Sequence, residues 1–157
     1  MNLGNSVVAD LLQFSLGMTP AEFSEKAKQY FVYPLFFNNV AAGGAAVQSF
    51  TTRSDSWFVV TALNAVVRTT AAGAPSVADR PFTVQIEEAG GGRNLFAAPA
   101  DFDTIFGTAQ LPGVMGAPFF VKYQSTMTVN LTSLAAIVLD VRLSFVGFKV
   151  FNTNMGV

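Results

Sequence analysis

The chain has 157 residues, of which 12% are charged and 51% are apolar, and its formal net charge is −1. This length predicts one domain with its own core, and the near-neutral charge without any basic run argues against nucleic-acid binding. The chain has no cysteine and no histidine. It therefore lacks disulfides, thiolate metal sites and the commonest general base, which excludes most hydrolytic triads.

The low charge calls for an explanation, since typical domains are roughly 25% charged. Phenylalanine alone occurs 16 times. A chain with so few charges and so many aromatic rings indicates that much of its surface meets another subunit, and we expect a homo-oligomer. The alternative is a well-packed β protein whose surface is built from serine, threonine and asparagine.

Residues 1–17 are predicted to form an arm that precedes a single domain over residues 18–157. The arm has scattered apolar positions that it cannot bury alone, and we expect it to dock on a neighbouring subunit. Because its start lacks positive charge and a continuous apolar core, it does not resemble a secretory signal, and synthesis in the cytosol is expected. These apolar positions are Val7, Val8, Leu11, Leu12 and Phe14.

A short amphipathic helix is predicted within residues 18–31, MTPAEFSEKAKQYF. Thr19 can cap this helix, Pro20 suits its first position, and Glu22 completes a capping box three residues after the cap. Apolar residues then recur at helical spacing as far as Phe31.

From residue 30 onward the apolar period becomes two, which predicts strands separated by glycine-, proline- and asparagine-containing turns. Residues 119–131 alternate most clearly and are predicted to form one strand with one wet face. Residues 95–116 are predicted to be mixed loop with one short strand. The other predicted strands cover residues 30–37, 47–52, 57–68 and 81–88, with turns at 41–46 and 89–94.

The first of these strands, YFVYPLFF, is apolar on both faces and contains Pro34, which predicts an edge strand or a bent one. Its aromatic side chains are predicted to lie in the core or at a subunit interface, with a ligand pocket as the third reading. The candidate interface residues of the chain are Phe31, Tyr33, Phe36 and Phe37 from this strand, with Leu11, Leu12 and Phe14 from the arm.

The segment over residues 126–151 is hydrophobic enough to raise the question of a membrane anchor. Its longest apolar run covers only residues 134–139, whereas a spanning helix needs about 20 apolar residues. Asp140 and Arg142 would each cost roughly 2.5–3.5 kcal/mol in the bilayer centre. The alternation from Leu139 to Phe145 instead predicts a strand, and the change of parity after it predicts a bulge at Val146 and Gly147.

Several strands with one confident helix predict an all-β fold, an antiparallel β-sandwich that we expect to be a jelly roll with one short N-terminal helix. A parallel α/β sheet is disfavoured because the sequence has no sustained βαβ alternation.

Few residues could carry chemistry, and no catalytic, cofactor or metal site is predicted. Glu87 and Glu88 should point to opposite faces of their strand. Asp101 and Asp103 share a parity in a loop and are read as solvated carboxylates, with a calcium site as the alternative. The run from Gly90 to Arg93 is read as a hairpin turn, with an anion-binding nest as the alternative.

The C-terminal half resembles the small β-sandwich virion proteins of tailed bacteriophages, above all capsid decoration, or cement, proteins. The resemblance rests on the turn GGGRNLF, the segment APFFVKYQSTMTVNLTS and the closing LDVRLSFVGFKVF, which together span residues 90–151. It implies a non-enzymatic subunit of the virion that forms trimers or dimers and bridges major capsid proteins on an icosahedral shell.

The leading functional hypothesis is therefore a structural assembly protein whose partners are its own copies and a protein lattice, with neither nucleic acid nor membrane involved. The alternative is a jelly-roll module that binds carbohydrate or another small ligand, with Trp57 or Tyr123 as a stacking platform. An enzyme ranks third.

Overall fold

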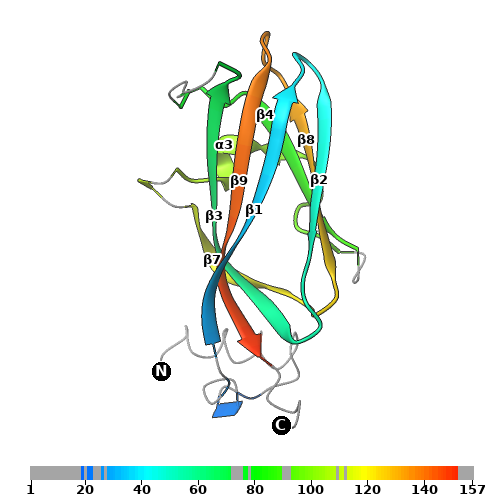
Figure 1. The fold of residues 1–157 in the computed structure, drawn as a ribbon, viewed down its shortest axis with the longest axis vertical. Helices are drawn as coiled ribbons and strands as arrows, with labels where there is room; N and C mark the ends of the chain where they lie inside the picture. Colours follow the sequence, from blue (N-terminus) through cyan, green and yellow to red (C-terminus); the bar gives the residue numbers. More distant parts are fainter. Residues whose placement is uncertain are drawn as a thin grey trace.

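Two antiparallel sheets pack face to face in the computed structural model, which describes residues 19, 21–22, 26, 28–71, 76–77, 79–89, 93–108, 110–111 and 113–151 (Figure 1). The first sheet has the order β1-β9-β3-β7 and consists of β1 (Lys28–Val40), β9 (Leu139–Phe151), β3 (Ser56–Thr69) and β7 (Gly113–Val121). The second has the order β2-β8-β4-β5, and consists of β2 (Ala45–Thr51), β8 (Thr126–Ser133), β4 (Phe82–Glu88) and β5 (Arg93–Asn94), with β6 (Ala100–Asp101) also paired to β4.

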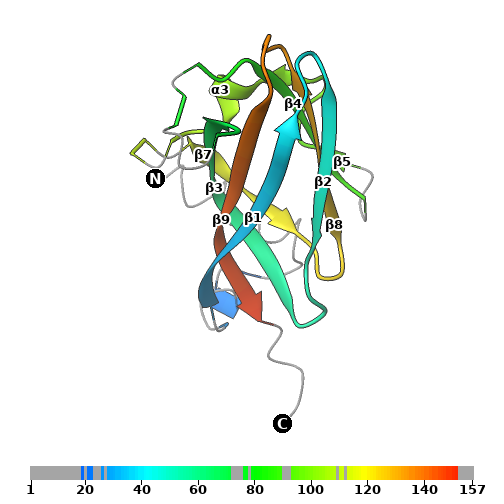
Figure 2. The same cartoon turned by 45° about the horizontal axis from the view of Figure 1, so that its top comes forward.

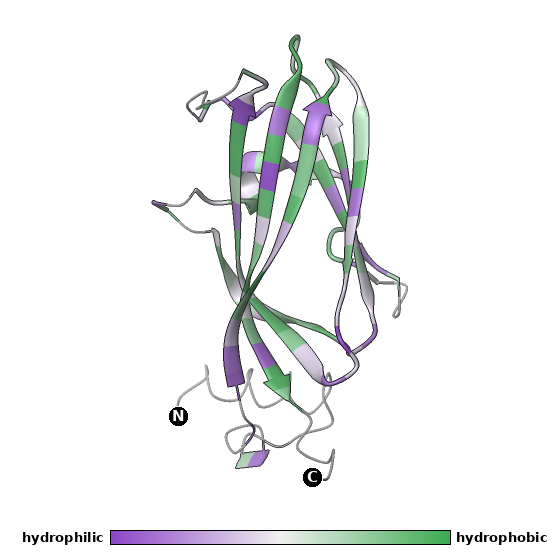
Figure 3. Cartoon of the chain, viewed as in Figure 1, coloured by the Kyte–Doolittle hydropathy of each residue, from purple (hydrophilic) through white to green (hydrophobic). Residues whose placement is uncertain are grey.

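The predicted all-β antiparallel sandwich is confirmed, whereas the jelly-roll connectivity stays a prediction. The core lies between the sheets because apolar residues alternate along the strands, as the hydropathy colouring shows (Figure 3). In β4, every second side chain from Phe82 to Glu88 is buried. Burying one large apolar side chain contributes roughly 1.5–3 kcal/mol, so this layer stabilises the fold. The largest side chains of the core that are almost completely buried include Phe37, Phe58, Phe82, Phe145, Leu63 and Ile86.

The bulge predicted in β9 lies instead in its partner strand β3. Val60 pairs with Gly147 and Ala62 with Val146, which leaves Thr61 as the extra residue. β9 itself keeps its alternation, so Lys149 faces inward with Leu143 and Phe145. The apolar residues at even positions near the end of β9 mark a second, smaller apolar cluster on the outer face of the first sheet. This cluster consists of Val59, Phe120 and Val150 with Trp57 and Phe148 packed against them.

The predicted N-terminal helix is partly correct. Ala21 and Glu22 are helical, and the Glu22 carboxylate accepts hydrogen bonds from the backbone N–H of Thr19 at 2.7 Å and from its hydroxyl at 2.9 Å, as a capping box requires. The helix cannot extend to Phe31, however, because β1 begins at Lys28. Long-range pairing with β9 outweighs the local helical spacing there. A four-residue helix, α3 (Phe102–Ile105), was not predicted.

The strand predicted over residues 119–131 is in fact two strands in different sheets, β7 and β8. A turn at residues 122–125 separates them, and Gln124 adopts a left-handed backbone with φ of 55°. No glycine or proline marks this turn in the sequence. Thr52 fixes it, because its hydroxyl donates to the carbonyl of Lys122 at 2.5 Å and accepts from the N–H of Ser125 at 3.0 Å.

Candidate interaction surface

Two connections at one end of the sandwich contain no ionisable side chain. We call this end the tip and define it as residues 41–44 (AAGG), between β1 and β2, and residues 134–138 (LAAIV), between β8 and β9. The two connections lie side by side at the top of both ribbon views (Figures 1 and 2). The strand ends that flank the two connections are paired. The N–H of Ser133 donates to the carbonyl of Gly44 at 2.8 Å, and Val40 pairs with Leu139.

The tip exposes large apolar side chains. Leu134 is 62% exposed, Ile137 55% and Val138 42%. Its backbone is nevertheless anchored, because the N–H of Leu134 donates to the carbonyl of Pro81 at 2.7 Å and that of Ala135 donates to the Ser133 hydroxyl at 3.2 Å. Exposed apolar side chains gathered on one anchored surface are typical of an interaction site.

The four candidate interface residues of β1 separate by strand parity. Phe37 is only 2% exposed and belongs to the core, so it is not a surface residue. Tyr33 also faces inward and stacks on Phe50 with ring centroids 4.3 Å apart, while Phe31 is half-buried against the core. Phe36 alone of these four projects outward, with 48% of its surface exposed. The arm residues Leu11, Leu12 and Phe14 lie outside the described residues.

The opposite end, which we call the base, consists of the β2–β3 connection (residues 52–55) and the β7–β8 turn (residues 122–125). Its buried polar side chains are paired. The Glu88 carboxylate is 1% exposed and accepts a hydrogen bond from the Ser125 hydroxyl at 3.0 Å. Glu87 lies on the other face of β4, as predicted.

Lys149 enters the core close to the base. It is 6% exposed, and its Nζ lies 3.5 Å from the ring centroid of Phe31 and 5.6 Å from that of Tyr33. Burial lowers the pKa of Lys149 below its ordinary value, and the nearby Arg53 lowers it further. A desolvated lysine is a candidate nucleophile in general. Here the rings of Phe31 and Tyr33 cover the amine, so we assign Lys149 a structural role rather than a catalytic one.

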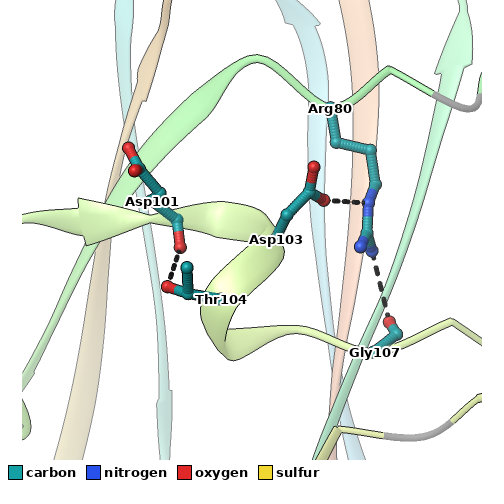
Figure 4. Close-up of polar contacts among 5 residues, drawn as sticks. All are labelled: Arg80, Asp101, Asp103, Thr104 and Gly107. Carbon is teal, nitrogen blue, oxygen red and sulfur yellow. Dashed lines mark hydrogen bonds and ion pairs between the residues drawn. The ribbon is translucent and has the colours of Figure 1, made fainter.

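The loop carboxylates considered for calcium are arranged differently from a metal site. Asp103 pairs with Arg80 at 2.5 Å, and that guanidinium also donates to the carbonyl of Gly107 at 3.3 Å (Figure 4). The carboxylate of Asp101 points away from this pair, while its backbone carbonyl accepts from the Thr104 hydroxyl (Figure 4). Among the described residues, no three acidic, histidine or cysteine side chains gather as metal ligands would.

The remaining motifs of the sequence give no built site. The glycines of the candidate anion nest, Gly90 to Gly92, lie outside the described residues. Trp57 and Tyr123 pack edge to face with ring centroids 5.7 Å apart, so each uses part of its ring on the other. A stacking platform for a sugar would use only the exposed part of Tyr123, which is 48% exposed.

Residues 134–139 are the longest apolar run of the closing segment, but no surface was predicted there from the sequence. The signal was present, because LAAIV shows no alternation and so fits neither an amphipathic strand nor a turn. In the described part of the chain, no helix has the length and apolar character needed to span a bilayer.

Comparisons with known proteins add little to this picture. No family model matches the sequence, and no curated protein matches it. Among solved structures, the crystal structure of GEBA250068378 from Sulfurospirillum deleyianum is similar to 79% of this chain and 99% of its own, with 7% sequence identity and a TM-score of 0.33. A similarity this weak supports no conclusion about function.

Proposed function

We propose that the chain is a non-enzymatic structural subunit that binds a protein lattice through its tip, in the manner of the decoration proteins of icosahedral capsids. The exposed, uncharged tip is the observation that carries the proposal. It combines three large apolar side chains, Leu134, Ile137 and Val138, on one anchored surface. Covering a surface of this kind with a partner is favourable, because apolar side chains are removed from water.

The tip alone gives a weak contact. Covering one of its large side chains contributes at most about 1.5–3 kcal/mol, and association itself costs several kcal/mol in lost freedom. Repeated copies on a lattice overcome this limit, because an oligomer that engages several sites at once binds far more tightly than one copy. The proposal therefore pairs the tip with a homo-oligomer.

A protein partner fits the tip better than a lipid surface does. Membrane-binding surfaces commonly add lysine or arginine beside their apolar residues, because the anionic headgroups attract them. The tip holds neither residue. An apolar patch on a partner protein requires no such charges.

The strand order supports a structural role as well. In it, β1-β9-β3-β7 faces β2-β8-β4-β5, which is compatible with a jelly roll, an architecture used by viral capsid and lectin domains. Because a fold does not determine a function, the tip rather than the order carries the proposal. The carbohydrate-binding alternative would need a free aromatic platform, and the mutual packing of Trp57 and Tyr123 disfavours it.

The proposal is tested with tagged copies produced in the native source and separated on a density gradient. We expect the wild-type chain to sediment with large particles, and the double variant Leu134→Asp/Ile137→Asp to remain at the top of the gradient. Val47→Asp is the matched control, since Val47 is 59% exposed but lies on β2, outside the tip. A wild-type chain that never sediments, or a double variant that sediments like the wild type, contradicts the proposal.

A further inference from the structure

The outer face of the first sheet carries a groove of about 380 Å³ whose lining includes no residue of the tip connections. Two rows of paired residues build it. Phe36, Arg142 and Val66 form one row across β1, β9 and β3, and Pro34, Ser144 and Asn64 form the next. Arg68 closes the groove at the end of β3. We call it the Arg142 groove.

Arg142 lies close to an exposed aromatic ring. Its guanidinium carbon is 5.5 Å from the ring centroid of Phe36, and both side chains are exposed. A guanidinium that contacts an aromatic ring can still donate from its N–H groups. The groove therefore presents guanidinium donors beside an apolar surface.

Within the described residues, neither Arg68 nor Arg142 forms a recorded ion pair, and the pair of Arg80 with Asp103 involves no residue that lines the groove. Asp140 is the register partner of Arg68, but its carboxylate instead accepts the backbone N–H of Asn39 at 2.7 Å. In a chain with only 9 lysines and arginines, two guanidinium groups beside a single carboxylate that already accepts a backbone N–H are an unusual concentration of positive charge.

We propose that the Arg142 groove binds an acidic, extended segment of a partner protein. A guanidinium fork matches the two oxygens of a carboxylate, and one such pair is stronger than a neutral hydrogen bond. Phe36, Val66 and Pro34 then receive apolar side chains that lie two residues from the acidic ones, because every second side chain of an extended segment points to the same side. Charge complementarity thus selects the occupant.

A nucleic-acid strand fits the groove less well. Binding a phosphate backbone relies on many cations, whereas this chain has a net charge of −1 and no basic run. The Asp140 carboxylate beside Arg68 would also repel a continuous row of phosphates. A short acidic peptide can place its carboxylates on Arg142 and Arg68 and avoid Asp140.

The binding experiment uses the purified full chain and a synthetic peptide labelled with fluorescein and followed by fluorescence anisotropy. Every second residue of the peptide is glutamate or valine in turn, with serine between them, so that both kinds of side chain share one face. We expect saturable binding that weakens as salt is added, because exposed charges are screened. The same peptide with glutamine in place of glutamate should bind at least about tenfold more weakly, which corresponds to about 1.4 kcal/mol. Equal binding of the two peptides overturns the proposal.

Variants locate the site. Arg142→Gln and Arg68→Gln should each weaken binding of the acidic peptide, and the double variant should abolish it. Lys122→Gln, which removes an exposed cation at the base, should bind like the wild type. Unchanged binding by the double arginine variant would overturn the assignment. So would stronger displacement of the peptide by duplex DNA than by free glutarate, which would identify a phosphate-binding surface.

The groove does not depend on the proposed function, and the two fail separately. The tip variant Leu134→Asp/Ile137→Asp should keep peptide affinity while it loses sedimentation with large particles. Loss of sedimentation with intact peptide binding supports both assignments. Because Arg68 and Arg142 are exposed, their glutamine variants are expected to fold, and circular dichroism provides the check.

Discussion

The two ends of the sandwich differ in how their connections treat polar and apolar side chains. At the base, polar groups that must leave water are paired: Thr52 and Ser125 tie the two connections together, and Glu88 is held beneath them. At the tip, the backbone is equally anchored, but the side chains are apolar and remain in solvent. The polar side chains of the base are paired within one chain, whereas the tip leaves apolar surface exposed to solvent.

An exposed apolar residue indicates an interaction surface only when the surrounding backbone is described and anchored. Leu111 and Val114 are even more exposed than Leu134, at 78% and 76%, but they neighbour a short stretch outside the described residues. The tip is described continuously and is anchored by hydrogen bonds. Substitutions at the base should therefore change folding, and substitutions at the tip should change association.

The largest expected effect on folding comes from Gly147, where the first sheet approaches the base. A Cβ at this position would lie 1.9 Å from the carbonyl oxygen of Val59, which is backbone and cannot move aside. Gly147→Ala should therefore destabilise the fold by more than about 3 kcal/mol, at or beyond the upper end of overpacking. Chemical denaturation measures the change.

Gly116→Ala is the control, because a Cβ there meets nothing within 4 Å. Similar stabilities for the two alanine variants would show that the close approach of β3 and β9 is wrong.

The next effect concerns the polar network of the base. Glu88→Ala removes the acceptor of the Ser125 hydroxyl and of the Lys122 N–H, and opens space in a buried position. Each unsatisfied buried group costs about 1–3 kcal/mol, so we expect a loss of that order in the free energy of unfolding. Thermal melting should show a lower Tm with no change in tip-dependent association. A loss of association without a loss of stability would break the distinction between the two ends.

Lys149 should give a smaller effect of opposite sign. Its pKa is lowered in the folded chain, so the unfolded chain holds the proton more tightly and stability is reduced at neutral pH. That loss is recovered as the pH rises through the folded pKa toward the ordinary lysine value of about 10.4. Burial raises the pKa of Tyr33, so its contribution opposes this recovery only above about pH 10.

Lys149→Met keeps the volume and removes the charge, and should raise Tm by the equivalent of less than about 1.5 kcal/mol while flattening the alkaline pH profile. Melting curves at several pH values provide the measurement. A variant less stable than the wild type would mean that the contacts with Phe31 and Tyr33 outweigh desolvation.

The smallest effect is expected at Asp140. An asparagine there keeps an oxygen that can accept the N–H of Asn39, so Asp140→Asn should cost only about 0–1 kcal/mol. Leu143→Ala, in the same strand but fully buried, should cost roughly 2–5 kcal/mol. A melt in which Asp140→Asn is the worse of the two would reverse the assignment of the inner and outer faces of β9.

The sequence predicted the features that depend on local alternation. The inward faces of β4 and of β9 up to Phe145 follow directly from their period of two, and the all-β antiparallel class follows from the number of such segments. The capping box of Thr19 and Glu22 is equally local, and its hydrogen bonds are present.

Features that depend on contacts between distant strands were missed. The bulge at Thr61 changes the parity of β3 opposite Gly147. The sequence signal appeared in β9 instead, because Phe148 and Val150 belong to the apolar cluster on the outer face of the sheet. The β7–β8 turn depends on Thr52, far away in the sequence. The tip could not be predicted because it forms where two connections distant in the sequence come together, and neither connection carries a motif.

The most direct test of the account is whether a partner covers the tip in the native assembly. Because the chain has no cysteine, Ile137→Cys introduces a unique thiol at the tip, and Lys122→Cys introduces one at the base. The rate of alkylation is measured on the isolated chain and on particles purified from the native source. We predict that the thiol at position 137 reacts at least about tenfold more slowly in the particle, as in the water-excluded centre of an interface, while the thiol at position 122 is unchanged. Equal alkylation of the position 137 thiol in the two states would contradict the assignment of the tip as the contact surface.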